Sequence, residues 1–377
     1  MTRPVSPAWP ALALALAVLA PTAALAAPLN ADKPLVPGDE YLVVGNNPDN
    51  LHVVDLRTDS LYKTCAVPGS VGPATLVMSP DKATAYLVTN RFDEVHGIAL
   101  DSCKVVFQAR MSQRPDERAK ALFALSLSND SKQLYVIQTP TTLNPDHYRV
   151  GQPRLAVYDA LAGEGAKPLR TLPAPRQVTV MATGHDGSLY MVGPDIYKFD
   201  PQTGQHTVAI PSRNWKRPRH APPDVLSVWP LKNAAEDFTI LYTTAKFKGK
   251  TGDLANADWI YGYFNINLRT GKTETRDFGP FTEIYFTGVR SPKDPNLMYG
   301  VLNRLAKYDI RQKKLLQAAE IPHSHYTASM NRDGSKVYLG GTWNNLAVYD
   351  AGDLKPLSTL ALPGGDMGAA APQTFTR

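Results

Sequence analysis

The sequence lacks the short motifs that mark most self-contained enzymes and cofactor-binding chains. It has no nucleophile elbow, Walker loop, HExxH helix or CxxCH haem-attachment site, and its eight histidines are scattered. These absences argue against a serine hydrolase, a P-loop NTPase, a zincin or a c-type cytochrome. Helical periodicity is also missing, which argues against a stacked helical solenoid.

The chain has little excess of one charge. Its formal net charge is +6, with one basic cluster, RNWKRPRH, from Arg213 to His220. The prolines and single tryptophan of this cluster predict a solvated loop. A nucleic-acid groove needs a longer basic patch interleaved with aromatic residues, so we expect no nucleic-acid partner.

Long apolar runs are missing after the first residues. Arg3 precedes the run Ala11–Ala20, and Ala24-Leu25-Ala26 has the small-residue pattern of a signal-peptidase site. Residues 1–26 are therefore predicted to be a cleaved secretory signal peptide, with 27–39 as a lead-in. The alternative, a membrane anchor, would need roughly 20 apolar residues. We expect a soluble periplasmic protein without a membrane anchor.

Cysteine is scarce, with only Cys65 and Cys103. They follow Asp55 and Asp101, in the outer parts of two neighbouring repeats. Export to an oxidising compartment favours a disulfide between them, which would fasten the two repeats together. Two free thiols are the alternative.

A repeated unit runs along nearly the whole chain. Each copy has apolar runs separated by polar turns, and its middle run closes with Asp or Asn. The seven closing residues are Asp55, Asp101, Asp159, Asp200, Asn267, Asp309 and Asp350, with separations of 46, 58, 41, 67, 42 and 41 residues. A period of roughly 40 to 50 residues is typical of four-stranded propeller blades. We predict one all-β domain over 40–377, a seven-bladed β-propeller, with the longer gaps as loop insertions.

Two further features of the repeats are structural. Turns such as SPD, SND, HDGS, SPKD and NRDGS are expected between the innermost strand and the next, where Asp and Asn suit tight turns. The first repeat lacks an inner strand before Tyr41, whereas residues remain after Leu362. The C-terminal segment, including Gln373, Thr374 and Phe375, is therefore predicted to complete the first blade and close the ring.

Metal binding has only a weak signal. His323 and His325, in PHSHY, are alternate residues that would share one face of a strand. A zinc site needs a third or fourth protein ligand, so we predict no metal site.

Unusual polar and aromatic residues occur where successive inner strands are expected to begin. In a propeller these positions converge on one mouth of the central channel, and loops on a rigid scaffold commonly bind ligands. They are Lys120, Phe123, Arg176, Gln177, Asp224, Trp229, Tyr285, His323, Ser324 and Tyr326. Each also has a structural interpretation, such as an Arg176–Asp224 ion pair or a Trp229 buried between blades.

The strings KALFALSLSND, APRQVTVMA, PPDVLSVW and IPHSHYTASMNRDGSKVYLGG, with the ending PQTFTR, resemble the β subunit of quinohemoprotein amine dehydrogenase. The resemblance runs in order from about Tyr41 to the C-terminus and is most specific around PHSHY. The propeller subunit of methylamine dehydrogenase and YVTN-type propellers are more distantly similar.

This resemblance implies a seven-bladed propeller in a three-chain periplasmic enzyme that oxidises primary amines to aldehyde and ammonia. It places cysteine tryptophylquinone on a small partner subunit and haem c on a dihaem cytochrome c subunit, with no cofactor bound covalently by the propeller. We therefore expect no catalytic residue in this chain. Trp229, Tyr285 and Tyr326 are the candidates for an aromatic wall of the substrate cavity, and Arg176, Gln177, Asp224, His323 and Ser324 for the partner interface.

Two other function classes stay open. A free-standing lactonase would need a metal in the channel, and the strand starts lack a carboxylate-rich set. A stand-alone periplasmic or surface binding propeller of the YVTN type would have similar repeats and no enzymatic partner.

Overall fold

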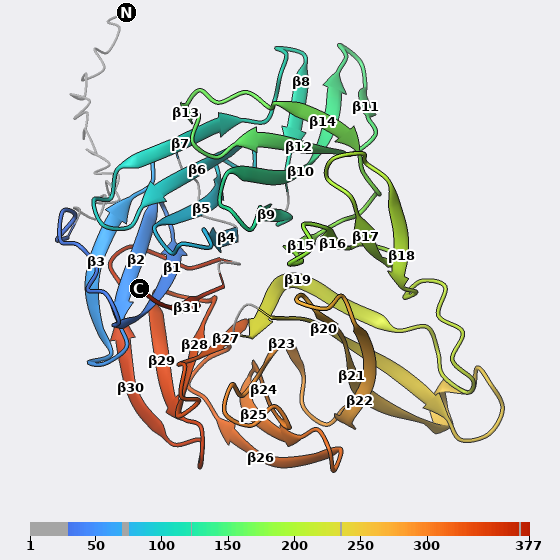
Figure 1. The fold of residues 1–377 in the computed structure, drawn as a ribbon. Helices are drawn as coiled ribbons and strands as arrows, with labels where there is room; N and C mark the ends of the chain where they lie inside the picture. The colour runs from blue at the N-terminus through green and yellow to red at the C-terminus, as the bar shows by residue number, and fades with distance from the viewer. Residues whose placement is uncertain (1–28, 70–74, 122, 234–235, 369–370) are drawn as a thin grey trace, which may run out of the picture.

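The computed structural model confirms a seven-bladed β-propeller (Figure 1). It describes residues 29–69, 75–121, 123–233, 236–368 and 371–377, while the side chains of 226–233 and 286 lie outside the description. Within these ranges the elements are β-strands, except for one short 3-10 helix, η1 (Leu254–Asn256). The predicted signal peptide lies outside the described residues.

Each blade is an antiparallel sheet whose strands follow one another outward from the channel. Blade 1 contains β31 (Gln373–Thr376), β1 (Glu40–Asn46), β2 (Asn50–Asp55) and β3 (Ser60–Ala66). Blade 2 contains β4 (Thr75–Met78), β5 (Thr84–Thr89), β6 (Glu94–Ala99) and β7 (Val105–Arg110), and β13 (Gly163–Glu164) pairs with β7. Blade 3 contains β9 (Leu125–Leu127), β10 (Gln133–Leu143), β12 (Arg154–Asp159) and β14 (Arg170–Pro173).

The remaining blades repeat this pattern. Blade 4 contains β15 (Val180–Thr183), β16 (Leu189–Val192), β17 (Ile196–Phe199) and β18 (His206–Ile210). Blade 5 contains β19 (Asp224–Asn233), β20 (Asp237–Phe247), β21 (Ala257–Asn267) and β22 (Thr273–Pro280). Blade 6 contains β23 (Tyr285–Arg290), β24 (Leu297–Leu302), β25 (Arg304–Asp309) and β26 (Lys314–Glu320). Blade 7 contains β27 (Thr327–Met330), β28 (Lys336–Gly340), β29 (Asn345–Asp350) and β30 (Pro356–Ala361).

Two blades extend beyond this plan. In blade 3, β8 (Glu117–Lys120) and β11 (Tyr148–Val150) pair with the far half of β10. In blade 5, β20 and β21 pair over their whole lengths, from Asp237–Asn267 to Phe247–Ala257. Figure 1 shows both extensions at the rim of the ring.

The repeated Asp and Asn residues mark the end of the third strand in every blade, as the spacing predicts. In six blades a side-chain oxygen of this residue accepts a backbone N–H two or three residues later, for example from Arg57 to Asp55 at 2.8 Å and from Gly352 to Asp350 at 2.7 Å. Asp101 instead accepts the N–H of Leu35 at 3.0 Å. These side chains close turns, which is the structural role expected for them.

A second set of turns joins the first and second strands of five blades. The carboxylate Oδ1 of an Asp accepts the backbone N–H two residues later at 2.9 to 3.1 Å in each turn. The Asp residues are Asp81, Asp130, Asp186, Asp294 and Asp333. One end of the ring is therefore built from nearly identical turns.

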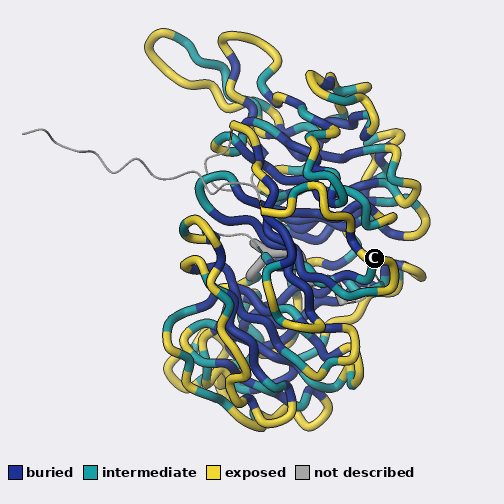
Figure 2. The backbone as a smooth tube through the Cα atoms, turned by 90° about the vertical axis from the view of Figure 1, so that its left-hand side faces the viewer, coloured by how far each residue is buried: buried dark blue, intermediate teal, exposed yellow. Residues whose placement is uncertain are grey.

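The core lies between blades rather than inside any one of them. Phe107 of blade 2 packs edge-on against Tyr86 of the same blade at 5.7 Å and Tyr158 of blade 3 at 5.9 Å, measured between ring centroids. Figure 2 shows buried strands throughout the ring and exposed residues mainly in the turns. Burial between neighbouring sheets supplies the hydrophobic stabilisation that a single blade lacks.

Ring closure by the C-terminal segment is confirmed. β31 pairs with β1 from Gln373–Val43 to Thr376–Glu40, so blade 1 contains both ends of the propeller. Phe375 packs near Tyr41 with 5.9 Å between ring centroids. Arg377 donates to Asp101 of blade 2 at 2.7 Å. The pairing of β31 with β1 covers the open edge of the blade.

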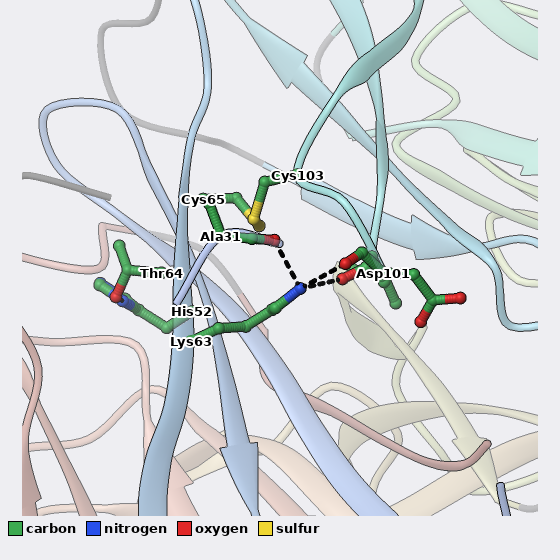
Figure 3. Close-up of a disulfide and its surroundings, with 8 residues drawn as sticks. Ala31, His52, Lys63, Thr64, Cys65, Asp101 and Cys103 are labelled. Atoms are coloured by element: carbon green, nitrogen blue, oxygen red, sulfur yellow. Dashed lines mark hydrogen bonds between the residues drawn. A yellow bond between two sulfur atoms is a disulfide. The ribbon is translucent and has the colours of Figure 1, made fainter. Parts of the chain in front are cut away.

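A disulfide joins Cys65 in β3 to Cys103 in the turn after β6, with 5.1 Å between their Cα atoms (Figure 3). The fully buried Lys63 lies beside it. Its Nζ donates to the carbonyl oxygens of Ala31, Leu100 and Asp101 at 2.9, 2.7 and 3.0 Å. Burial lowers the pKa of Lys63, while Asp101 opposes this effect. Blades 1 and 2 and the lead-in are thus fastened at one place.

No helix in the described part of the chain is long and apolar enough to cross a membrane.

Candidate functional site

The connection leading into an inner strand lies at the same end of the ring as the connection between the second and third strands. Blade 7 shows this directly, because Tyr326 precedes β27 and Trp343 lies between β28 and β29, yet both line one cleft. The cleft has a volume of about 530 Å³. We call it the blade 7 cleft and define it by His323, Ser324, Tyr326, Thr342, Trp343, Asp366 and Gly368.

Two large aromatic side chains are exposed at the cleft, among polar residues. Trp343 is 60% exposed and Tyr326 is 36% exposed, which is unusual for such large side chains. His323 stacks on Trp343 with 4.3 Å between ring centroids and 14° between planes. Aromatic faces with polar edges suit ligands that have an apolar body and a polar or cationic end.

Backbone hydrogen bonds hold the cleft in place. The N–H of Trp343 donates to Oδ2 of Asp366 at 2.9 Å, and its carbonyl accepts the N–H of Met367 at 2.8 Å. The N–H of Tyr326 donates to Gly340 at 3.0 Å. The segment after β30 is therefore attached to the turn that presents Trp343. Asp366 also places a carboxylate at the cleft.

Ser324 connects the cleft to blade 6. Its hydroxyl donates to Oδ1 of Asn303 at 2.6 Å, and its carbonyl accepts hydrogen bonds from Thr342 and from Nδ1 of His323. The hydroxyl of Thr287, in β23, donates to the carbonyl of Tyr326 at 2.8 Å. The predicted neighbours His323, Ser324 and Tyr326 do come together, at the junction of two blades.

A second imidazole lies next to the cleft, out of contact with solvent. His325 is fully buried, and its ring centroid is 4.3 Å from that of His323. Neither ring nitrogen of His325 has a hydrogen-bond partner among the described residues. Burial, with a smaller contribution from His323, lowers the pKa of His325 to about 4. His325 is therefore neutral at pH 7.

Tyr285 is placed differently from the prediction. It is 1% exposed and stacks on Tyr261 with 4.1 Å between ring centroids, inside the core between blades 5 and 6. Gly300 lacks the Cβ that would come within 2.6 Å of this ring. Burial raises the pKa of Tyr285 well above its ordinary value. Its ring presents no surface at the mouth, so it is a core residue of this chain rather than a wall.

The other predicted residues lie at strand starts on different blades. Arg176 and Gln177 are exposed before β15, and Asp224 is exposed at the start of β19. Arg176 and Asp224 form no ion pair with each other in the structure as described. The backbone of Trp229 belongs to β19, and its side chain is outside the described residues.

Thr342, Trp343 and Asp366 are not among the residues that the sequence predicts for the site. They lie in a turn between strands and in the segment after β30, not at a strand start. The string GGTWNN could have indicated Thr342 and Trp343, because a large aromatic residue lies among the small and polar residues of a turn. Trp343 has a φ of 51°, the left-handed conformation common in such turns.

No group of three or more His, Cys, Asp or Glu side chains is arranged for a metal ion within the described residues.

Comparisons with known proteins give the fold. No family model matches the chain, and no curated protein matches it. Among solved structures, Kuenenia stuttgartiensis hydrazine synthase matches with a TM-score of 0.54 and 14% identity, over 86% of this chain and 98% of that one. Dihydro-heme d1 dehydrogenase NirN matches with a TM-score of 0.54 and 14% identity, over 91% and 77%. The periplasmic gluconolactonase of Pseudomonas aeruginosa matches with a TM-score of 0.53 and 15% identity, over 90% and 100%.

Proposed function

We propose that this chain is the propeller subunit of a periplasmic quinohemoprotein amine dehydrogenase, and that the blade 7 cleft forms one wall of its substrate cavity. The single observation that carries the proposal is the exposed pair Trp343 and Tyr326 beside the carboxylate of Asp366. An amine substrate has a cationic end and, in many cases, an apolar body. Aromatic faces favour both parts, and a carboxylate favours the cation.

The residues of the cleft would bind and orient rather than react. Trp343, supported by the stacked His323, would cover the apolar part of the amine. Asp366, fixed by the N–H of Trp343, would face the ammonium end before the proton is lost. Closing the cleft against a partner would exclude water from the bound amine. No residue of this chain is assigned a catalytic role.

The cofactors would belong to the partners. Cysteine tryptophylquinone on a small subunit would oxidise the amine when present, and haem c on a dihaem cytochrome would receive the electrons. Support for a subunit role comes from the hydrazine synthase match, which covers 98% of a chain of that enzyme. Arg176, Gln177 and Asp224 are exposed around the same end of the ring and are proposed to face the partners.

A periplasmic location is part of the proposal. The predicted signal peptide would export the chain, and the disulfide between Cys65 and Cys103 suits an oxidising compartment.

The test is gentle affinity purification of the tagged chain from the periplasm of its native host during growth on amines. Co-purifying chains are stained for haem and for quinone redox cycling on a denaturing gel. A haem-positive band together with a small quinone-positive band supports the proposal. If the chain emerges alone, with neither stain, the function is that of a stand-alone binding propeller.

A further inference from the structure

The basic cluster Arg213–His220 is a mostly exposed loop that is attached to the end of β20. His220 pairs with Lys246 at the end of β20, and two backbone hydrogen bonds flank this pair. The N–H of Ala221 donates to Ala245 at 2.9 Å, and the N–H of Phe247 donates to Arg219 at 2.8 Å. The cluster therefore lies beside a second basic run, Lys246–Lys250, which is distant in the sequence.

Packing fixes this segment. Trp215 is partly buried against Tyr242 and Phe264, with 5.2 and 5.7 Å between ring centroids. The guanidinium of Arg217 donates two hydrogen bonds to the carboxylate of Asp277, at 2.7 and 2.5 Å. This ion pair lowers the pKa of Asp277 against the opposing effect of burial. The segment is a loop with mostly exposed residues, as predicted, but Trp215 and Arg217 anchor it to blade 5.

The two runs form a surface that we call the blade 5 extension, comprising residues 213–221, 244–260 and 280–284. These three segments contain seven Lys or Arg, two Asp and Glu283, and Glu283 is paired with Arg304 of blade 6. One of these acids, Asp258, is paired with Lys248 at 2.7 Å. The exposed cations with no ion-pair partner in the described structure are Arg213, Lys216, Arg219, Lys246 and Lys250, and Arg219 donates to backbone carbonyls.

Large apolar side chains lie among these cations. Trp259 is 45% exposed, Leu254 is 52% exposed and Phe281 is 37% exposed. The N–H of Phe281, directly after β22, donates to the carbonyl of Trp259 in β21 at 2.9 Å, so the two residues are neighbours. Aromatic residues and Arg are enriched in protein interfaces. The extension includes the connection between β20 and β21, which places it at the same end of the ring as the blade 7 cleft.

We propose that the blade 5 extension is a docking surface for an acidic protein partner. The unpaired cations attract a surface of opposite charge and orient it during encounter, while Trp259 and Leu254 supply buried apolar area on contact. The inference rests on the proposed function, since it takes this partner to be one of the subunits of that complex.

The experiment compares three tagged full-length chains purified from the native periplasm: wild type, Lys246→Glu with Lys250→Glu, and a matched control. The control is Arg311→Glu with Lys314→Glu, two exposed cations without ion-pair partners in the described structure. Arg311 lies in the turn between β25 and β26 and Lys314 at the start of β26, at the other end of the ring. The readout is the amount of haem-positive and quinone-positive partner per propeller chain. Circular dichroism and thermal unfolding verify that all three are folded.

The expected result is a loss of about tenfold or more of a co-purified partner in the Lys246 and Lys250 variant, because like charges across an interface cost several kcal/mol. The control should retain its partners, and added salt should weaken retention by the wild type. Trp259→Ala should also reduce retention.

Three results would overturn the inference. Equal retention by both charge variants would remove the docking surface and leave the proposed function standing. A wild-type chain that purifies alone would remove both. Flotation of the purified wild type with phosphatidylglycerol vesicles, lost in the Lys246 and Lys250 variant, would assign the surface to a membrane instead of a protein.

Discussion

The two ends of the ring differ in how they are built. At one end, the turns between first and second strands repeat one arrangement, in which an Asp carboxylate accepts a backbone N–H two residues later. At the other end, the connections range from Gly193–Asp195 in blade 4 to the long extensions of blades 3 and 5. The repeated end carries structural turns. The varied end contains the blade 7 cleft, and we propose that it is the end that binds ligands and partners.

Truncation after Pro372 should open the ring, disrupt both of its ends and have the largest effect on stability. It removes β31, its pairing with β1, the contact of Phe375 with Tyr41 and the ion pair of Arg377 with Asp101. We expect loss of cooperative thermal unfolding, followed by circular dichroism. Removing Arg377 alone is the control. A truncated chain with an unchanged Tm would contradict closure by the C-terminal segment.

Replacing both Cys65 and Cys103 by Ser should lower the stability of the whole ring without a specific effect on either of its ends. The disulfide closes a separation of 38 residues. The chain-entropy relation gives about 4 kcal/mol for such a loop. Urea unfolding of the variant against the wild type measures this difference. At a low temperature, where the variant is folded, we expect the blade 7 cleft to bind its ligand normally. Weakened binding under these conditions would show that the disulfide also shapes the site.

As the pH falls, the buried histidines should lose their stabilising contribution before the aspartates of the repeated turns do. Burial lowers the pKa of His52 and of His325 to about 4, from 6.5, so the unfolded chain takes up protons first as the pH falls. The contribution of each buried histidine to the free energy of unfolding is fully present above pH 6.5. It is lost as the pH falls toward 4, by on the order of 3 kcal/mol for each histidine. The repeated Asp81, Asp130, Asp186 and Asp333 have a pKa below 3.8 and lose their contribution only at still lower pH.

Unfolding free energies of the wild type and of His325→Gln between pH 7 and pH 4 test this order. The variant should start less stable at pH 7 and show a shallower decline. Parallel pH profiles for the two proteins would exclude His325 as a cause.

Asp333→Ala should have the smallest effect. It removes the hydrogen bond from the N–H of Ser335, 2.9 Å long, at an exposed turn of the repeated end. We expect a loss of about 1 kcal/mol in urea unfolding. Amine oxidation by an assembled complex should not change. Altered kinetics in this variant would contradict the division of roles between the two ends.

Much of the fold follows from local chemistry in the sequence. The spacing from Asp55 to Asp350 predicts seven blades because six of these residues accept a backbone N–H within the turn that follows, and such local hydrogen bonds do not depend on distant partners. Ring closure follows from an incomplete first repeat. The number of blades and the closure of the ring can therefore both be predicted from the repeated pattern alone.

The site follows less completely, because it depends on which blades meet. His323 and Tyr326 lie at the predicted strand start, but their neighbours Trp343 and Asp366 come from a turn and from the segment after β30. Tyr285 occupies an equivalent position and yet fills the core, since Gly300 leaves room beneath its ring. The basic segments around Arg219 and Lys246 become one surface only through the pairing of a loop with β20.

The most direct measurement of the central claim is kcat/KM for amine oxidation by the assembled complex containing Trp343→Ala. Trp343 is largely exposed, so stability and assembly should be unchanged, and loss of its aromatic face should lower kcat/KM about tenfold, as expected for roughly 1.4 kcal/mol of lost binding. An intact complex with unchanged kcat/KM would contradict a role of the blade 7 cleft in binding the amine.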